Sequence, residues 1–208
     1  IDIVIKGSEV LKEHEFYIKE IIEKSKYLLS DREESIISKM KNTGSNAWLK
    51  LKDNLISNLK VDIEIDGEMK ELPLTVVLNM AYDPNGELRR KAYFAEIESY
   101  KKVEEGVAAA LNGIKGEVLT VCDLRGYKSP LDMTLVNSRM DEESLDAMLE
   151  AMKESMPLFR KYLRRKGELL GYKNGLPFYE MYAPVSEAEM KFTYEEAAKY
   201  VEKNFRTF

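Results

Sequence analysis

The sequence predicts an all-α protein with one small β-hairpin near residues 60–72. Of the 208 residues, 33% are charged and 44% are hydrophobic, a balance typical of amphipathic helices that enclose a core. Apolar residues recur every three or four positions along most of the chain, whereas strict alternation is confined to residues 61–65. The small numbers of glycine (11) and proline (6) argue against a disordered chain.

Residues 8–59 are expected to form three helices. Apolar positions at helical spacing predict the first helix over residues 8–29. Ser30 and Glu33 have the spacing of a capping box, so a second helix should begin there, and Thr43-Gly44-Ser45 should end it. The third helix carries Trp48 and continues to residue 59.

A β-hairpin should follow these helices. Val61, Ile63 and Ile65 alternate with acidic residues, Asp66-Gly67 has the composition of a tight turn, and a second strand returns over residues 69–72. A proline follows at position 73, where it suits the first turn of a short helix.

Helical spacing then continues over residues 93–118. Glycines within this stretch weaken a helix by up to about 1 kcal/mol each, so they either allow close packing or mark a break. The glycines are Gly106, Gly113 and Gly116. Arg125-Gly126 should end the region, and Ser129-Pro130 should open the next helix.

A long helix should begin after Asp141 and end at Gly171. Pro157 should kink it, because proline removes one backbone hydrogen bond and crowds the preceding turn. Three methionines on one face of this helix, Met148, Met152 and Met156, are expected to belong to the core. An aromatic loop over residues 172–184 follows, and the capping-box spacing from Thr193 to Glu196 opens a last helix. Residues 1–72, with the hairpin, and residues 73–208, as a helical bundle, are possible sub-units of a single helical chain.

Composition restricts the classes of function. The net charge is −5 and the basic residues are dispersed, which predicts no nucleic-acid partner. No apolar run approaches the roughly 18 residues of a membrane span, so no membrane partner is expected either. Cys122 is the only cysteine, which excludes an internal disulfide and favours the cytoplasm. The chain starts at Ile1 without methionine or a signal-peptide pattern, from which we expect a truncated or processed boundary with more protein before it.

The single histidine limits catalysis further. His14-Glu15 begins like the His-Glu-x-x-His zinc motif, but Ile18 stands at the position of the second histidine, so we interpret His14 as a surface helix residue. A zinc site could still use Asp, Glu and Cys, but Cys122 stands alone and all-carboxylate zinc sites are unusual, so no catalytic residue or metal ligand is predicted in this chain. Two short basic clusters, Arg89-Arg90-Lys91 and Arg164-Arg165-Lys166, are interpreted as solvated helix faces.

The segment 125–131 allows two interpretations. It is either a helix end, a short link and a new helix start, or a loop that offers Arg125 and the Tyr127 phenol to a ligand. The pattern of residues favours the first interpretation.

Six segments in order resemble the oligoendopeptidase F family, zinc metallopeptidases related to thimet oligopeptidase that cut short peptides inside a deep channel. The segments are Leu28-Leu29-Ser30-Asp31-Arg32-Glu33-Glu34, Thr43-Gly44-Ser45-Asn46-Ala47-Trp48, residues 83–92, Arg125-Gly126-Tyr127-Lys128-Ser129-Pro130-Leu131, Phe178-Tyr179-Glu180-Met181-Tyr182-Ala183-Pro184 and Tyr194-Glu195-Glu196-Ala197. The family has its zinc-binding helix downstream of these segments. The resemblance therefore implies a non-catalytic middle portion of a cytoplasmic zinc peptidase, with zinc held by a catalytic domain outside this chain.

This resemblance implies a role in the wall of the substrate channel, with short peptides and the catalytic domain as partners. Arg125, Tyr127, Tyr179 and Tyr182 are the expected residues near the channel or the domain junction. Two alternatives stay open, a stand-alone helical interaction module and a zinc-free relative of the peptidase. A face that normally meets the catalytic domain would also favour self-association of the chain alone.

Overall fold

The computed structural model describes residues 1–185 and 191–207, and these ranges are mostly helical. The elements in order are α1 (Asp2–Lys6), α2 (Glu9–Glu13), α3 (Glu15–Ser25), α4 (Asp31–Thr43), α5 (Ser45–Ser57), β1 (Lys60–Ile65), β2 (Glu68–Pro73), α6 (Leu74–Asn79), the 3-10 turn η1 (Met80–Tyr82), α7 (Gly86–Tyr100), α8 (Glu104–Leu124), α9 (Pro130–Ser138), α10 (Glu142–Leu169), the 3-10 turn η2 (Phe178–Glu180) and α11 (Tyr194–Phe205). The predicted all-α class with one hairpin is confirmed.

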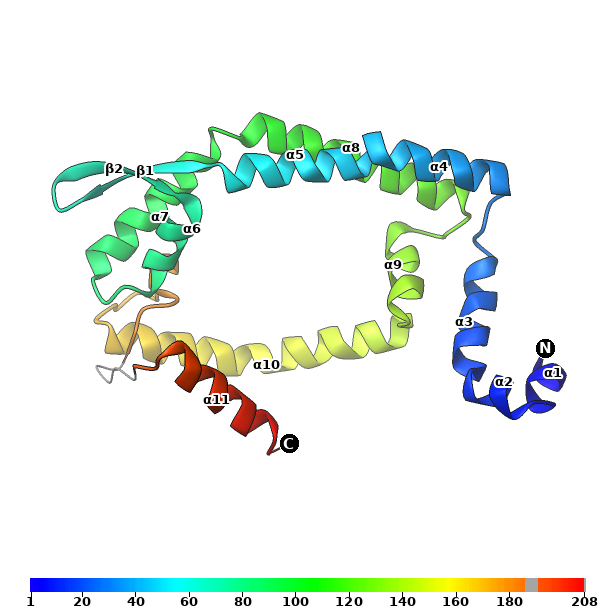
Figure 1. Cartoon of the computed structure of the whole chain (residues 1–208). Coiled ribbons are helices and arrows are strands. Elements are labelled where there is room, and N and C mark those ends of the chain that lie inside the picture. The colour runs from blue at the N-terminus through cyan, green and yellow to red at the C-terminus, as the bar shows by residue number, and fades with distance from the viewer. Residues whose placement is uncertain (186–190, 208) are drawn as a thin grey trace.

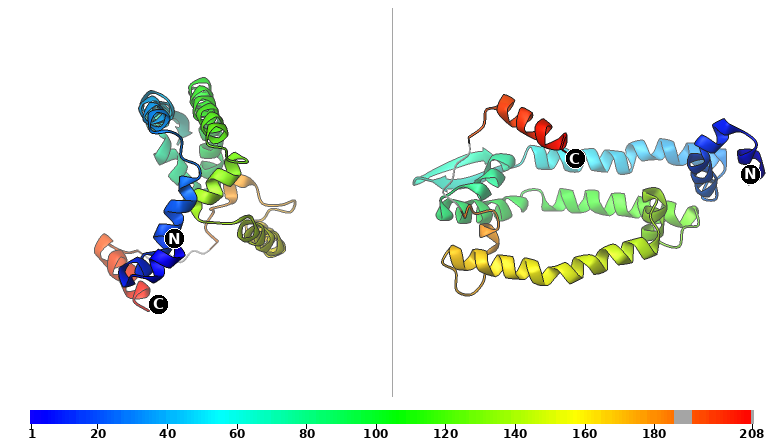
Figure 2. Two further views of the ribbon diagram at one scale, coloured as in Figure 1. Left: turned by 90° about the vertical axis from the view of Figure 1, so that its right-hand side faces the viewer. Right: turned by 90° about the horizontal axis from the view of Figure 1, so that it is seen from below.

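The helices form an elongated frame rather than a closed bundle (Figure 1). Helices α4 and α5 follow one another along one side, with α8 packed beside α5. Helix α9 connects the two long sides, and α10 runs back along the opposite side toward α6, α7 and the hairpin, as the right-hand view in Figure 2 also shows. The loop after α10 then places η2 against α7 and closes the frame.

The predicted hairpin is confirmed, and it covers the main hydrophobic core. Strands β1 and β2 are antiparallel, with Val61 opposite Leu72 and Ile65 opposite Glu68. Asp66 and Gly67 adopt φ angles of 54° and 81°, the left-handed conformation that two-residue hairpin turns require. The buried members of the core come from both sides of residue 72 and are Leu59, Val61, Ile63, Leu74, Val77 and Ala92. The division of the chain into two sub-units stays a prediction.

Glycine determines how closely α5 and α8 pack. A Cβ atom at Gly113 would lie 2.6–2.8 Å from three atoms of the Trp48 indole, and one at Gly106 would lie 2.7 Å from Cδ1 of Leu55. Of the two roles expected for these glycines, close packing is therefore the one observed. The helix break lies elsewhere, at residues 101–103, so the predicted helical region of 93–118 belongs to two helices, α7 and α8.

One further helix prediction needs correction. The region 8–29 contains two helices, α2 and α3, which meet at the exposed His14, rather than a single one. Helix α10 continues through Pro157 without interruption, and the kink expected there stays a prediction. Capping predictions fared better. The reciprocal hydrogen bonds of both capping boxes are present, and Asp141 and Ser129 cap α10 and α9 as expected.

The apolar stripe of α10 is exposed, which corrects the expectation that its methionines lie in the core. Met148, Met152 and Met156 are 41%, 56% and 48% exposed, and Phe159 and Tyr162 continue the stripe. The pattern identified an apolar face correctly. Within the described part of the chain, however, no element packs extensively against this face.

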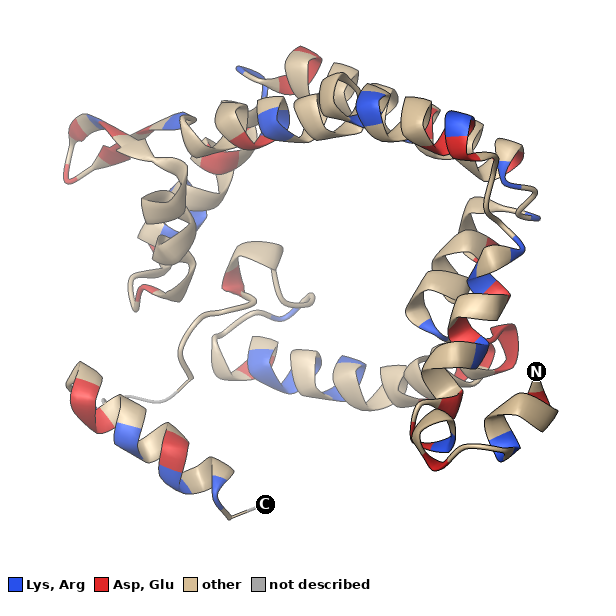
Figure 3. Ribbon diagram, turned by 45° about the vertical axis from the view of Figure 1, so that its right-hand side comes forward, with Lys and Arg blue, Asp and Glu red and all other residues tan. Residues whose placement is uncertain are grey.

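Charged residues of both signs are interspersed along the helices (Figure 3). This matches the dispersed basic residues of the sequence. Among the described residues, no helix is both long enough and apolar enough to cross a bilayer.

Candidate functional site

The four residues singled out from the sequence lie at two different corners of the frame. Arg125 and Tyr127 lie at the turn between α8 and α9, beside the link from α3 to α4. Tyr179 and Tyr182 lie in and just after η2, beside η1 and α7. Each pair lines a separate pocket, which we call the Tyr27 pocket and the Tyr179 pocket.

In the Tyr27 pocket, Arg125 makes a two-pronged ion pair with Glu34. Its Nη1 and Nη2 donate to the two carboxylate oxygens at 2.7 Å each, and Nη1 also donates to the Tyr27 carbonyl at 2.9 Å. Paired donation of this kind fixes the orientation of the guanidinium as well as balancing its charge. Arg125 thus ties the α8 end to α4 and to the end of α3, and a direct contact with substrate stays a prediction.

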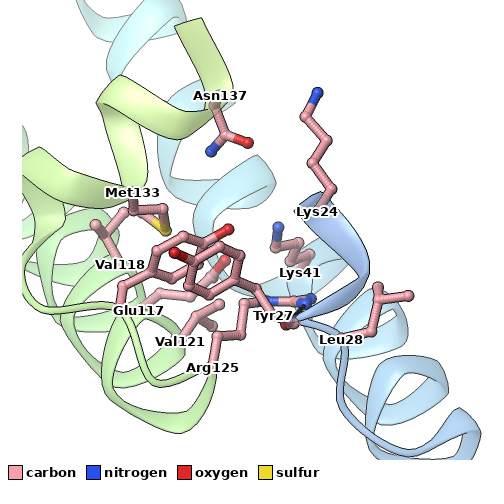
Figure 4. A pocket seen from close by; sticks show the side chains of 11 residues that line it. Lys24, Tyr27, Leu28, Lys41, Glu117, Val118, Val121, Arg125, Met133 and Asn137 are labelled. Atoms are coloured by element: carbon pink, nitrogen blue, oxygen red, sulfur yellow. Dashed lines mark hydrogen bonds between the residues drawn. The ribbon is translucent and has the colours of Figure 1, made fainter. Parts of the chain in front are cut away.

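Tyr127 stacks on Tyr27, with ring centroids 3.9 Å apart and ring planes within 9°. Burial raises the pKa of the Tyr127 phenol, so the group stays protonated at neutral pH. Figure 4 shows Tyr27 in this pocket, together with Lys41 and Asn137. The pocket has a volume of about 360 Å³ and is lined by Lys24, Tyr27, Leu28, Lys41, Glu117, Val118, Val121, Arg125, Tyr127, Met133 and Asn137.

Acid should weaken the contact between Arg125 and Glu34. Hydrogen bonds from Arg125, and then from the Leu29 amide, hold the pKa of Glu34 below its usual range. Because the pKa is lower in the folded state, the contribution to stability is present at neutral pH and is lost as the pH falls below about 4.3. We expect Glu34→Gln to lower the thermal unfolding midpoint at neutral pH and to approach the parent chain below that pH. A deficit that persists unchanged in acid would contradict this assignment.

The Tyr179 pocket rests on a buried ion pair that sequence reasoning missed. Arg89 on α7 donates through Nε, at 3.1 Å, and through Nη2 to Oε2 of Glu180 on η2. The two side chains are only 6% and 1% exposed. Nη1 of Arg89 also donates to the Asp83 carbonyl, so the guanidinium is held on every side. The interpretation of Arg89 as part of a solvated helix face was therefore wrong.

Two more side chains hold the same loop in place. Tyr172 donates its hydroxyl to Oε1 of Glu180 at 3.1 Å, and burial together with this bond raises the pKa of Tyr172 to about 12. Lys166, from the second basic cluster, is buried rather than solvated, and its ammonium donates to the Met181 carbonyl at 2.7 Å. We call Arg89, Glu180, Tyr172 and Lys166 the latch, because they fix the 172–185 loop to α7 and to the end of α10.

The missed latch residues had only a partial signal in the sequence. Arg89 and Glu180 each lie in a segment that resembles the oligoendopeptidase F family, at 83–92 and 178–184. Nothing in helical spacing identifies which member of the Arg89-Arg90-Lys91 cluster becomes buried. Sequence reasoning also missed three residues of the Tyr27 pocket, namely Tyr27, Lys41 and Asn137. Helical spacing does not identify them, because only the fold brings them into the same pocket as Tyr127.

The described residues do not offer the ligands of a zinc site. Among them, no group of three or more histidine, cysteine, aspartate or glutamate side chains is placed to hold a metal ion. Cys122 is buried on α8. His14 is exposed and lies at the N-terminus of α3, on a different helix. Protein zinc sites need at least three such ligands converging on one point.

Comparison with known proteins places this fold in a family. A family profile described as Oligopeptidase F matches residues 2–60, and a profile described as Peptidase family M3 matches residues 79–205. The chain is 28% identical to Oligopeptidase PepF of Bacillus subtilis over 203 residues, which cover 96% of this chain and 30% of PepF. It is 24% identical to an oligoendopeptidase F homolog of Lactococcus lactis, over 95% of this chain and 33% of the relative.

Solved structures show the same fold. A putative peptidase from Chlamydophila abortus superimposes with a TM-score of 0.73 at 24% identity, over 94% of this chain and 33% of that structure. Oligoendopeptidase-F from Enterococcus faecium superimposes with a TM-score of 0.73 at 20% identity, over 95% and 38%. The chain thus spans about a third of the length of the curated relatives it matches. Because the M3 profile alone covers more than half of the sequence, this chain belongs to peptidase family M3.

Proposed function

We propose that this chain forms a non-catalytic wall of the substrate channel in an M3 oligopeptidase that hydrolyses short peptides. The observation that carries this proposal is the exposed apolar stripe of α10, in a chain that matches about a third of its peptidase relatives. An apolar stripe of this length on a helix normally packs against further protein. A catalytic domain docked on α10 would leave the two pockets at the corners of the frame available for peptide contacts.

Zinc enters this proposal through the family resemblance. The described residues do not fit a zinc ion, so no catalytic step is assigned to them. We place the metal ligands and the general base of the enzyme in sequence that follows Phe208, as the resemblance implies. A cytoplasmic location belongs to the same proposal and is supported by the single cysteine. Self-association of the chain through the α10 stripe remains a prediction.

The runner-up function is a helical interaction module without enzymatic activity. The same exposed stripe on α10 would serve that role, with a separate protein as its partner. The gene sequence beyond the codon for Phe208 distinguishes the peptidase proposal from the interaction module. We expect a His-Glu-x-x-His motif within the next few hundred codons, and an uninterrupted downstream sequence without one would contradict the peptidase proposal.

A further inference from the structure

The Tyr179 pocket combines aromatic walls with an apolar floor. It has a volume of about 370 Å³ and is formed by residues of α6, η1, α7 and the loop that carries η2. Val77 and Ala92 form a buried floor, being 1% and 3% exposed. Tyr82, Phe178 and Tyr182 stand at the rim and are 61%, 65% and 54% exposed. Such a pocket offers several ring faces and an apolar base to a side chain that enters from outside.

The pocket also carries one uncompensated negative charge. Two charged residues line it, Arg89 and Glu96. The charge of Arg89 is balanced by Glu180, as described above. Glu96 is half-buried, and its Oε1 accepts a hydrogen bond from the Tyr100 hydroxyl at 2.7 Å. No cation among the described residues forms an ion pair with Glu96, so the pocket as a whole favours a positively charged occupant.

We propose that the Tyr179 pocket binds a basic side chain, lysine or arginine, of a peptide substrate. The aliphatic stem of such a side chain would lie on the floor formed by Val77 and Ala92. Its cationic head would meet the faces of the aromatic rings and the Glu96 carboxylate, two interactions that reinforce each other. This inference rests on the proposed function, which supplies the peptide.

The alternative occupants are less well matched. An acidic side chain would be repelled by Glu96, and a purely apolar one would remove water from the carboxylate without replacing its lost hydrogen bonds. A basic side chain has a long aliphatic stem that can pack on the apolar floor and a cationic head that can pair with the carboxylate. It therefore fits the lining of the pocket best.

The latch holds the pocket in shape before a ligand arrives. Phe178 and Tyr179 directly precede Glu180 in η2, so the buried ion pair with Arg89 fixes the backbone that carries both rings. The ring centroids of Phe178 and Tyr179 lie 5.7 Å and 6.0 Å from that of Tyr93 on α7. A pocket ordered in this way loses little conformational freedom when it binds a ligand.

The test uses two short fluorescent peptides that differ at one position, lysine in one and the uncharged norleucine in the other. Binding to the chain is followed by fluorescence anisotropy. We expect the lysine peptide to bind about three- to tenfold more tightly. Glu96→Gln should reduce this preference, because it removes the carboxylate and leaves only the aromatic rings to favour the cation. The matched control is Glu98→Gln on the same helix, since Glu98 is exposed, pairs with Lys101 and does not line the pocket, and it should leave the preference intact.

The outcomes separate this inference from the function on which it rests. Equal binding of both peptides to the parent chain, or a lysine preference that is undiminished in Glu96→Gln, would overturn the basic-side-chain assignment while leaving peptide binding in place. Failure of the chain to bind any peptide would overturn the proposed function as well. Circular dichroism of the Glu96→Gln variant verifies that a reduced preference does not come from unfolding.

Discussion

Replacing Arg89 by methionine is expected to lower the free energy of unfolding by about 3–5 kcal/mol, because it leaves a buried carboxylate without its charged partner. Glu180 is 1% exposed and would keep only the Tyr172 hydroxyl, from 3.1 Å, among its side-chain donors. Urea unfolding followed by circular dichroism measures the loss. A change below about 1 kcal/mol would show that the latch is not a major source of stability.

Two further variants isolate the role of the pair. Lys101→Met removes an ion pair whose members are 66% and 70% exposed, so it should change stability by less than about 1 kcal/mol. The double variant Arg89→Met/Glu180→Met replaces both charges with apolar side chains and should recover most of the loss, since no unpaired charge is left buried. If the double variant is as unstable as the single one, packing rather than the unpaired charge explains the effect.

The second large effect is expected where α5 and α8 touch. Gly113→Ala places a methyl group against the Trp48 indole, with three ring atoms within 2.6–2.8 Å of the new carbon. Overpacking of this kind costs about 1–3 kcal/mol and should exceed the gain of up to about 1 kcal/mol in helix propensity. Thermal unfolding followed by the fluorescence of Trp48, the single tryptophan, measures both stability and the local contact.

Gly116 provides the matched control, since it lies one helical turn further along α8. A Cβ atom there would meet nothing within 4 Å. Gly116→Ala should therefore stabilise the chain by about 0.5–1 kcal/mol through helix propensity alone. Shifts of the same sign and size in both variants would contradict the assignment of Gly113 to a close helix–helix contact.

The features predicted correctly from the sequence were those that depend only on residues close together in the chain. The capping boxes at Ser30 and Thr193 and the turn at Asp66-Gly67 depend on residues at most three positions apart, so their geometry follows from local chemistry. The family resemblance rested on short segments of the same kind, and the profile matches over residues 2–60 and 79–205 confirm it.

The pairings that build the two pockets could not be predicted in this way. Arg89 and Glu180 are 91 positions apart, as are Arg125 and Glu34. Helical spacing shows that a residue lies on a charged face, but it does not show which charge another part of the chain will cover. The α10 stripe illustrates the converse, because an apolar pattern identifies a face without identifying what packs on it.

The central proposal is that this M3 chain is a part of an oligopeptidase that does not contain the catalytic centre. Metal analysis of the purified chain, combined with incubation with a quenched fluorescent peptide, tests it most directly. We expect no stoichiometric zinc and no cleavage. One zinc per chain together with turnover that a chelator abolishes would contradict the account.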